Sequence, residues 1–232
     1  MISTLYGAPA EHAGTSKHII TIEDPIEYAL EGINQGQTND KAGFTFARGL
    51  RAILRQDPDV IMVGEIRVSE TLQTALEASL TGHLVLSTLH TNSAVATPAR
   101  LLDIGAEPYL LSSSLVGVLA QRLVRRICPT CRVPIPVPHG IAHVFGERVP
   151  AHLYRGQGCS DCRGTGYRGR LPIQELMVLN DHLRNLILDR APETQIADAA
   201  DRSGINDLRK SALLKARNGV TSLAEINRVT KD

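Results

Sequence analysis

Short apolar runs alternate with helical patterns in the first half of the chain. Residues 18–23, 60–63 and 83–88 are rich in β-branched or aliphatic residues, which predicts three mostly buried strands. Between and after them, apolar residues recur every three to four positions, which predicts helices over 44–56, 69–80, 94–104 and 110–127. Ser69 is the expected cap of the second helix. Strands that alternate with helices indicate an α/β fold, with a mostly parallel sheet covered by helices on both faces.

The pattern changes near Cys128, where prolines and glycines become frequent. A loop-rich stretch of this kind is not expected to build a hydrophobic core unaided. Helical patterns return over 181–190, 193–203, 205–218 and 223–230. We therefore expect three parts: a core over 1–117, a cysteine-containing subdomain over 118–175 and a helical subdomain over 176–232.

Composition narrows the functional classes. The 232 residues include 43% apolar and 21% charged residues, as in a globular protein rather than a disordered or fibrous one. With 25 Lys and Arg against 24 Asp and Glu, and few aromatic residues, nothing indicates binding to nucleic acid. No apolar run reaches the roughly 18 residues of a membrane span, and no secretion signal is visible. We expect a soluble, cytoplasmic protein.

Polar residues follow each of the three predicted strands. Glu23 and Asp24 follow the first strand, Gly64 and Glu65 the second, and Thr88, His90 and Thr91 the third. In an open parallel sheet, ligands bind beyond the carboxyl ends of the strands. Carboxylates with a histidine and a threonine at that edge would suit a metal-bound nucleotide, with oxygen ligands for Mg²⁺ and a base for a water molecule. The alternative is that these residues are polar only because the ends of strands are exposed to solvent. The occurrence of ionisable or hydroxyl residues after all three strands counts against this alternative.

The two histidines around the third strand differ in position. His83 lies at the entry end of the strand, whereas His90 lies just past its exit. His90 is therefore the better catalytic candidate.

Four cysteines form two C-x-x-C pairs and are expected to bind a metal: Cys128, Cys131, Cys159 and Cys162. Zn²⁺ favours a tetrahedral set of four thiolates, and the composition indicates a reducing compartment. A disulfide pair or unliganded thiols are the alternatives. Because four thiolates fill the coordination sphere, the expected role is structural.

Arginines flank both cysteine pairs: Arg122, Arg125, Arg126 and Arg132 at the first, and Arg163, Arg168 and Arg170 at the second. They could bind phosphate, or they could form a solvated basic face, which the neutral total charge favours. Arg48, Arg51 and Arg55 form one stripe along the first predicted helix, facing solvent, phosphates or a neighbouring subunit.

Four segments together resemble the secretion ATPases. Residues 22–27 (IEDPIE) resemble their aspartate box, 54–67 their Walker B region and 81–92 their histidine box. Residues 119–131, with 158–162 and 166–170, are similar to their tetracysteine segment. The resemblance covers about residues 3–232. The sequence of residues 79–83 and 110–125 is most similar to that of the type II (general) secretion pathway ATPases, the GspE family. The type IV pilus assembly ATPases of the PilB family are near neighbours, and the retraction ATPases, which generally lack the cysteines, fit less well.

This resemblance implies a RecA-like P-loop core, a zinc-binding segment and a helical C-terminal region. It further implies a hexamer on the cytoplasmic face of the inner membrane that uses ATP and Mg²⁺. Such a motor would act on an inner-membrane platform that assembles a pseudopilus for protein export.

The resemblance also implies roles for individual residues. Glu65 would be the Walker B glutamate, which polarises the attacking water or holds Mg²⁺. Glu23, Asp24 and Glu27 would lie near Mg²⁺ and the phosphates. The remaining expected positions are the histidine-box residues His83 and His90, with His90 as sensor of the γ-phosphate, Thr88, and Gly64, which stands where many P-loop proteins carry an aspartate.

Two departures from the family pattern stand out. Val68 replaces an aspartate that commonly follows Glu-Ile-Arg, and the sequence contains no G-x-x-x-x-G-K-[S/T] motif. Residues 3–6 resemble the helix after the P-loop, which puts Met1 at the lysine position and Ile2 at the serine or threonine position. We therefore expect a C-terminal portion with little ATPase activity alone. A zinc-stabilised interaction module without catalysis is the alternative of another class.

Overall fold

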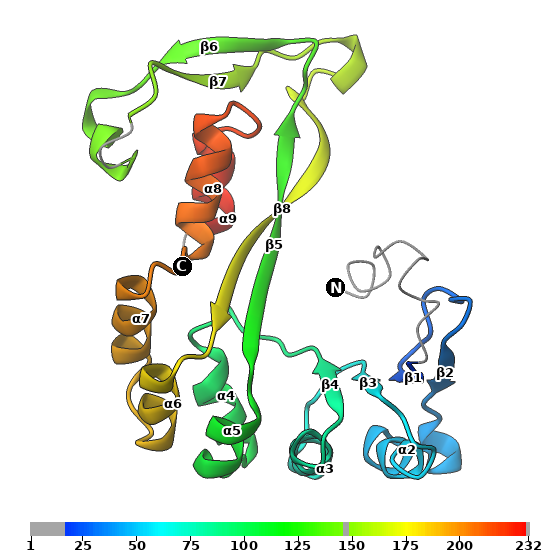
Figure 1. Ribbon diagram of the computed structural model, residues 1–232. Coiled ribbons are helices and arrows are strands. Elements are labelled where there is room, and N and C mark those ends of the chain that lie inside the picture. Colours follow the sequence, from blue (N-terminus) through cyan, green and yellow to red (C-terminus); the bar gives the residue numbers. More distant parts are fainter. Residues whose placement is uncertain (1–16, 146–148, 231–232) are drawn as a thin grey trace. The chain divides into compact units, whose positions relative to one another are not determined.

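A computed structural model describes residues 17–145 and 149–230, which form two compact units (Figure 1). The first unit contains the described residues up to His90, together with Thr97–Leu115 and Arg184–Ala191. The second unit contains Thr91–Ala96, Val116–Leu183 and the described residues from Pro192 onward. The chain therefore leaves the first unit after His90 and returns to it at Thr97.

A four-stranded parallel sheet organises the first unit, in the order β2-β1-β3-β4. Its strands are β1 (Ile19–Glu23), β2 (Asn34–Gln37), β3 (Val60–Val63) and β4 (Leu84–Ser87). The three strands predicted from apolar runs are confirmed. The expectation that all three are mostly buried is wrong for β4, because Leu84 at the edge of the described sheet is 50% exposed. Strand β2 was not predicted, because Asn-Gln-Gly-Gln contains no apolar residue.

Helices α2 (Phe46–Ile53) and α3 (Ser69–Leu80) pack against this sheet. Helix α2 comes close to β1 at Gly49, where a Cβ atom would lie 2.9 Å from Cδ1 of Ile22. The predicted cap of α3 is wrong. Val68 occupies the N-cap position without a side-chain hydrogen bond, and Ser69 is the first helical residue. The first unit also contains a 3-10 turn (Asp40–Ala42), α4 (Thr97–Ile104) and α5 (Pro108–Ser114).

The predicted helix over 110–127 is wrong beyond α5. The chain instead forms β5 (Gly117–Ile127), which pairs with β8 (Tyr167–Val178) in an antiparallel ribbon. The apolar positions of 118–127 suit either a helix or a strand. The deciding contact is with β8, which lies about fifty residues further along the chain and alternates between buried and exposed positions from Ile173 to Val178.

A hydrophobic core joins several elements of the second unit. Buried residues come from β5, β7 (His152–Gly156), β8, α8 (Leu208–Arg217) and α9 (Leu223–Thr230): Val124, Leu153, Ile173, Leu208, Ala212, Leu213, Ala216 and Ile226. The cysteine-containing stretch thus shares its core with the C-terminal helices, and the predicted boundary at 175/176 falls inside β8. The other elements of this unit are β6 (Arg132–Pro136), which pairs with β7, two 3-10 turns (His139–Phe145 and Ser160–Cys162) and α7 (Glu193–Arg202). Helix α6 (Asp181–Leu188) begins in this unit and continues into the first, to which Arg184–Ala191 belong.

Glu225 on α9 links this core to β5. It is 1% exposed, and its carboxylate accepts hydrogen bonds from Arg228 Nε at 2.8 Å, Arg125 Nε at 2.9 Å and the Arg125 backbone N–H at 2.9 Å. Hydrogen bonds from Arg228 lower the pKa of Glu225, burial opposes them, and Arg125 lowers it further, to about 2. The carboxylate therefore stays ionised at neutral pH.

We predict that the second unit loses stability as the pH falls from about 4.5 toward 2. The folded pKa lies below the unfolded value, so the stabilisation is present above the unfolded pKa and disappears as Glu225 is protonated. Allowing for the half-exposed guanidinium groups, we expect Glu225→Gln to cost about 2 kcal/mol at pH 6. Urea unfolding followed by circular dichroism at pH 6 and pH 3 measures this. An equal cost at both pH values would contradict the prediction.

Candidate functional site

The carboxyl ends of β1, β3 and β4 meet at one edge of the sheet, because these three strands are parallel neighbours. Glu23 ends β1, Glu65 lies two residues beyond β3, and Thr88 directly follows β4. The expectation that polar residues after three strands share one edge of the sheet is confirmed.

Backbone hydrogen bonds fix the turn that carries Glu65. The Gly64 N–H donates to the Ile22 carbonyl at 2.8 Å, and the Ile66 N–H donates to the Thr88 carbonyl at 3.1 Å. The Thr88 hydroxyl donates to the Gly64 carbonyl at 2.5 Å. Glu65 is therefore held from both neighbouring strands.

Glycine at position 64 is explained by crowding. A Cβ atom there would lie 3.3 Å from the carbonyl oxygen of Ile22 and 3.4 Å from the ring of Phe46. A larger side chain would have to displace the neighbouring strand or α2. The acidic group is accordingly carried by the next residue, Glu65.

The structure brings Glu65 and His90 together. Nε2 of His90 lies 3.4 Å from Oε2 of Glu65, and Nε of Arg67 lies 2.7 Å from the same oxygen. The Glu65 side chain is 16% exposed, whereas His90 is 86% exposed. A partly desolvated carboxylate beside an exposed imidazole can exchange protons with a bound water molecule. Arg67 was not among the predicted site residues, although its position two residues after Glu65 was a usable signal.

The residues predicted to form an aspartate box are divided between a buried and an exposed group. Glu23 is 5% exposed, and its Oε1 accepts hydrogen bonds from Thr21 Oγ1 at 2.6 Å and Gln35 Nε2 at 2.9 Å. Asp24 and Glu27 are exposed beyond β1. Across the described ranges, no hydrogen bond or ion pair joins these three carboxylates to Glu65. Thr21 and Gln35 were not predicted, because nothing local in the sequence places Gln35 beside Glu23.

His83 lies at the opposite end of β4 from His90. Its Nδ1 is 2.9 Å from the Ala78 carbonyl oxygen and 3.2 Å from the Thr81 hydroxyl, so it joins the end of α3 to the start of β4. The first unit does not bring His83 to the carboxyl edge. Met1 and Ile2, expected at the phosphate-binding positions, lie outside the described residues.

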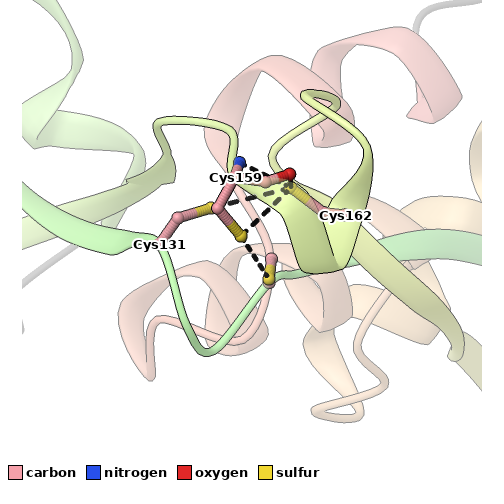
Figure 2. A group of neighbouring side chains, drawn as sticks. Cys131, Cys159 and Cys162 are labelled. Carbon is pink, nitrogen blue, oxygen red and sulfur yellow. Dashed lines mark hydrogen bonds between the residues drawn. The ribbon is translucent and has the colours of Figure 1, made fainter.

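The four cysteines converge in the second unit (Figure 2). The Sγ–Sγ distances are 3.8 Å for Cys128–Cys159, 3.8 Å for Cys131–Cys162 and 3.7 Å for Cys159–Cys162. These distances are too long for disulfide bonds, and all four thiols are free. A tetrahedral zinc ion with ligands at ~2.3 Å would separate its sulfurs by about 3.8 Å. The donor set therefore fits zinc in both chemistry and spacing.

Backbone N–H groups support the sulfur atoms. Cys162 Sγ accepts from the backbone of Cys159 at 3.2 Å and of Gly166 at 3.3 Å, and Cys131 Sγ accepts from Gly158 at 3.3 Å. Burial raises the pKa of Cys162, but these donors lower it more, to about 6. The backbone N–H of Cys162 lowers the pKa of Cys159, whereas burial and the neighbouring thiols raise it more, to about 11. Four clustered thiolates repel one another, and a bound cation would remove that repulsion.

Several of the flanking arginines have internal partners. Arg132 stacks on Tyr154 with its guanidinium carbon 3.8 Å from the ring centroid, and Arg125 stacks on Tyr167 at 4.2 Å while binding Glu225. In the first unit, Arg51 pairs with Glu70 at 2.8 Å, and Arg48 donates to the Gly43 carbonyl. These arginines are thus partly occupied by contacts within their own units.

A parallel sheet that presents Glu65 and His90 at its carboxyl edge has the architecture of the RecA-like ATPases. The family model of Type II/IV secretion system proteins matches residues 3–228. The chain belongs to this family.

Two curated relatives illustrate the resemblance in sequence. The type II secretion system protein E of Pseudomonas aeruginosa is 51% identical over 232 residues, which cover 99% of this chain and 46% of that protein. The type IV pilus assembly ATPase PilB of Thermus thermophilus is 51% identical over 218 residues, which cover 92% of this chain and 24% of PilB. The chain thus spans about half the length of its type II relatives.

The same fold occurs in solved structures. The pilus retraction motor PilT with bound ADP matches all of this chain and 58% of its own, with a TM-score of 0.72 and 30% identity. Among the described residues, no helix is both long and apolar enough to cross a membrane.

Proposed function

We propose that the chain is the nucleotide-hydrolysing part of an ATPase motor subunit for type II protein secretion. The observation that carries this proposal is the fixed position of Glu65, held between β1 and β4 and in contact with His90. The relatives include a type II secretion system protein E and a type IV pilus assembly ATPase, and this supports a motor in one of these two systems.

In this proposal, Glu65 accepts a proton from the attacking water, and His90 senses the γ-phosphate beside it. Asp24 and Glu27 are exposed oxygen donors for Mg²⁺ and its water ligands. Glu23 is already bound by Thr21 and Gln35, so it orients the aspartate box more than it reaches solvent. Gly64 and Thr88 fix the backbone from which Glu65 projects, and His83 supports β4 from its opposite end. ATP with Mg²⁺ supplies the phosphoryl group and its charge compensation.

The four cysteines would hold a structural zinc ion, since all four coordination positions are occupied by protein ligands. We infer further that the protein acts as a homohexamer, peripheral on the cytoplasmic face of the inner membrane. Its partners there would be the secretion platform proteins, and no nucleic acid is involved. The sequence has no P-loop motif, so we expect the 232-residue chain alone to hydrolyse ATP poorly.

A zinc-stabilised interaction module without catalysis is the alternative. Such a module has no need for a carboxylate fixed between two strands beside a histidine. The first unit therefore favours the motor.

A chimera tests the proposal. This chain replaces the matching half of the type II secretion system protein E of Pseudomonas aeruginosa, and secretion and ATP hydrolysis are measured. The parallel chimera in Thermus PilB is scored for pilus assembly. Restored secretion supports type II function, restored piliation alone supports the pilus alternative, and folded but inactive chimeras would support the interaction module.

A further inference from the structure

Thr91–Ala96 directly follows His90 and belongs to the second unit, while the residues before and after it belong to the first. It is therefore a covalent connection between the second unit and His90. Two charged side chains of the second unit bind its backbone.

Glu175 on β8 binds the N–H groups of this segment. It is 2% exposed, and its Oε1 accepts hydrogen bonds from Ala94 at 3.0 Å and Val95 at 3.3 Å. The backbone N–H of Leu208, the first residue of α8, also donates to the carboxylate. One buried carboxylate thus connects the segment, β8 and α8.

Arg122 on β5 binds a carbonyl group of the same segment. Its Nη2 donates to the Asn92 carbonyl at 3.0 Å, and its Nη1 donates to the Val229 carbonyl on α9 at 2.6 Å. The segment is therefore held through its donors by a carboxylate and through an acceptor by a guanidinium group.

Burying Glu175 is costly, since a carboxylate loses hydration in the protein interior. The neighbouring buried positions on the same face of β8 are Ile173 and Met177, so an apolar side chain would suit the core. Glu225, another buried carboxylate of this unit, binds two arginines. Glu175 has no cationic partner of this kind among the described residues, and the backbone N–H groups of Ala94, Val95 and Leu208 donate to it instead. What it contributes is a fixed path for the segment after His90.

We propose that Glu175 and Arg122 are positioning residues that hold Thr91–Ala96 and thereby couple the second unit to His90. The structural part concerns this segment alone, and its catalytic consequence rests on the proposed ATPase function. Movement of β8 or α8 would reach His90 through these hydrogen bonds.

The structural part is tested on the 232-residue chain by hydrogen exchange and NMR. In Glu175→Leu, which keeps the volume but removes the acceptor, we expect Ala94 and Val95 amide exchange to accelerate at least about tenfold. The imidazole signals of His90 should shift as well. Glu175→Gln retains an acceptor oxygen and should restore most of the protection. If Glu175→Leu does not fold, Arg122→Met tests the same segment by removing the donor to Asn92.

Glu225→Leu is the matched control, because it removes a buried carboxylate of the same unit whose hydrogen bonds come from Arg125 and Arg228. It should speed exchange at Arg125 while leaving the His90 signals unchanged. Unchanged exchange at Ala94 and Val95 in Glu175→Leu, or equal His90 shifts in the control, would overturn the proposal.

The catalytic consequence is measured in the Pseudomonas chimera. Glu175→Leu should lower kcat about tenfold with little change in KM for ATP, and Glu175→Gln should recover most of the loss. A rise in KM with kcat unchanged would overturn the coupling to His90. Failure of the ATPase proposal itself would appear separately, as an inactive parent chimera with normal exchange behaviour in the chain.

Discussion

Glu65→Gln is expected to lower ATP hydrolysis by the Pseudomonas chimera at least about 100-fold, because a positioned general base contributes roughly 10²–10⁴ in rate. Glutamine has nearly the same shape and keeps a side-chain oxygen that can contact Arg67 and His90, but it cannot take a proton from water. Phosphate release at saturating ATP measures the loss. Nucleotide affinity, measured with a fluorescent ATP analogue, should change little.

Glu70→Gln is the matched control for this substitution. Glu70 is an exposed glutamate of the same unit. It lies in the first turn of α3 and pairs with Arg51 of α2. Its loss removes one surface ion pair, which contributes little to stability. Glu70→Gln should therefore keep the parent activity. Substantial hydrolysis by Glu65→Gln would rule out Glu65 as the base.

The carboxyl edge of the sheet could be predicted because its signals are local. Each of β1, β3 and β4 is an apolar run followed at once by polar residues, and parallel strands bring such ends together. The cysteine cluster was equally accessible, since two C-x-x-C pairs predict a metal site by spacing alone. In both cases the functional residues belong to, or directly follow, the short sequence pattern that predicts them.

The parts that could not be predicted depend on contacts between distant residues. Strand β2 has no apolar pattern and is placed by pairing with β1. The apolar spacing in β5 predicts a helix, and the segment is a strand because it pairs with β8. Glu175 is a single polar residue between apolar neighbours on the same face of β8, and its partners Ala94 and Val95 lie about eighty residues earlier in the sequence. Periodicity within a single segment contains no information about such partners.

Removal of zinc is expected to unfold much of the second unit, beyond the cysteine loops. Two hydrogen bonds join β5, which leads into Cys128, to the turn between α8 and α9: the Ile127 N–H donates to the Val220 carbonyl at 2.9 Å, and the Thr221 hydroxyl donates to the Arg125 carbonyl at 2.8 Å. The shared core adds α8 and α9 to the same cooperative unit. A structural zinc site contributes on the order of 10 kcal/mol, comparable to the stability of a whole domain.

Cys162→Ser tests this expectation without chelator. Serine removes the sulfur that accepts hydrogen bonds from the backbone N–H groups of Cys159 and Gly166. Elemental analysis should find one zinc per parent chain and much less in the variant, and hydrogen exchange should accelerate in α8 and α9 together with the cysteine loops. The four-stranded sheet of the first unit has its own core and should keep its protection. Ser160→Ala, in the same 3-10 turn, is the control that leaves all four sulfurs in place. If metal loss exposed only 128–162, the cysteine segment would be an independent appendage rather than part of the core that holds α8 and α9.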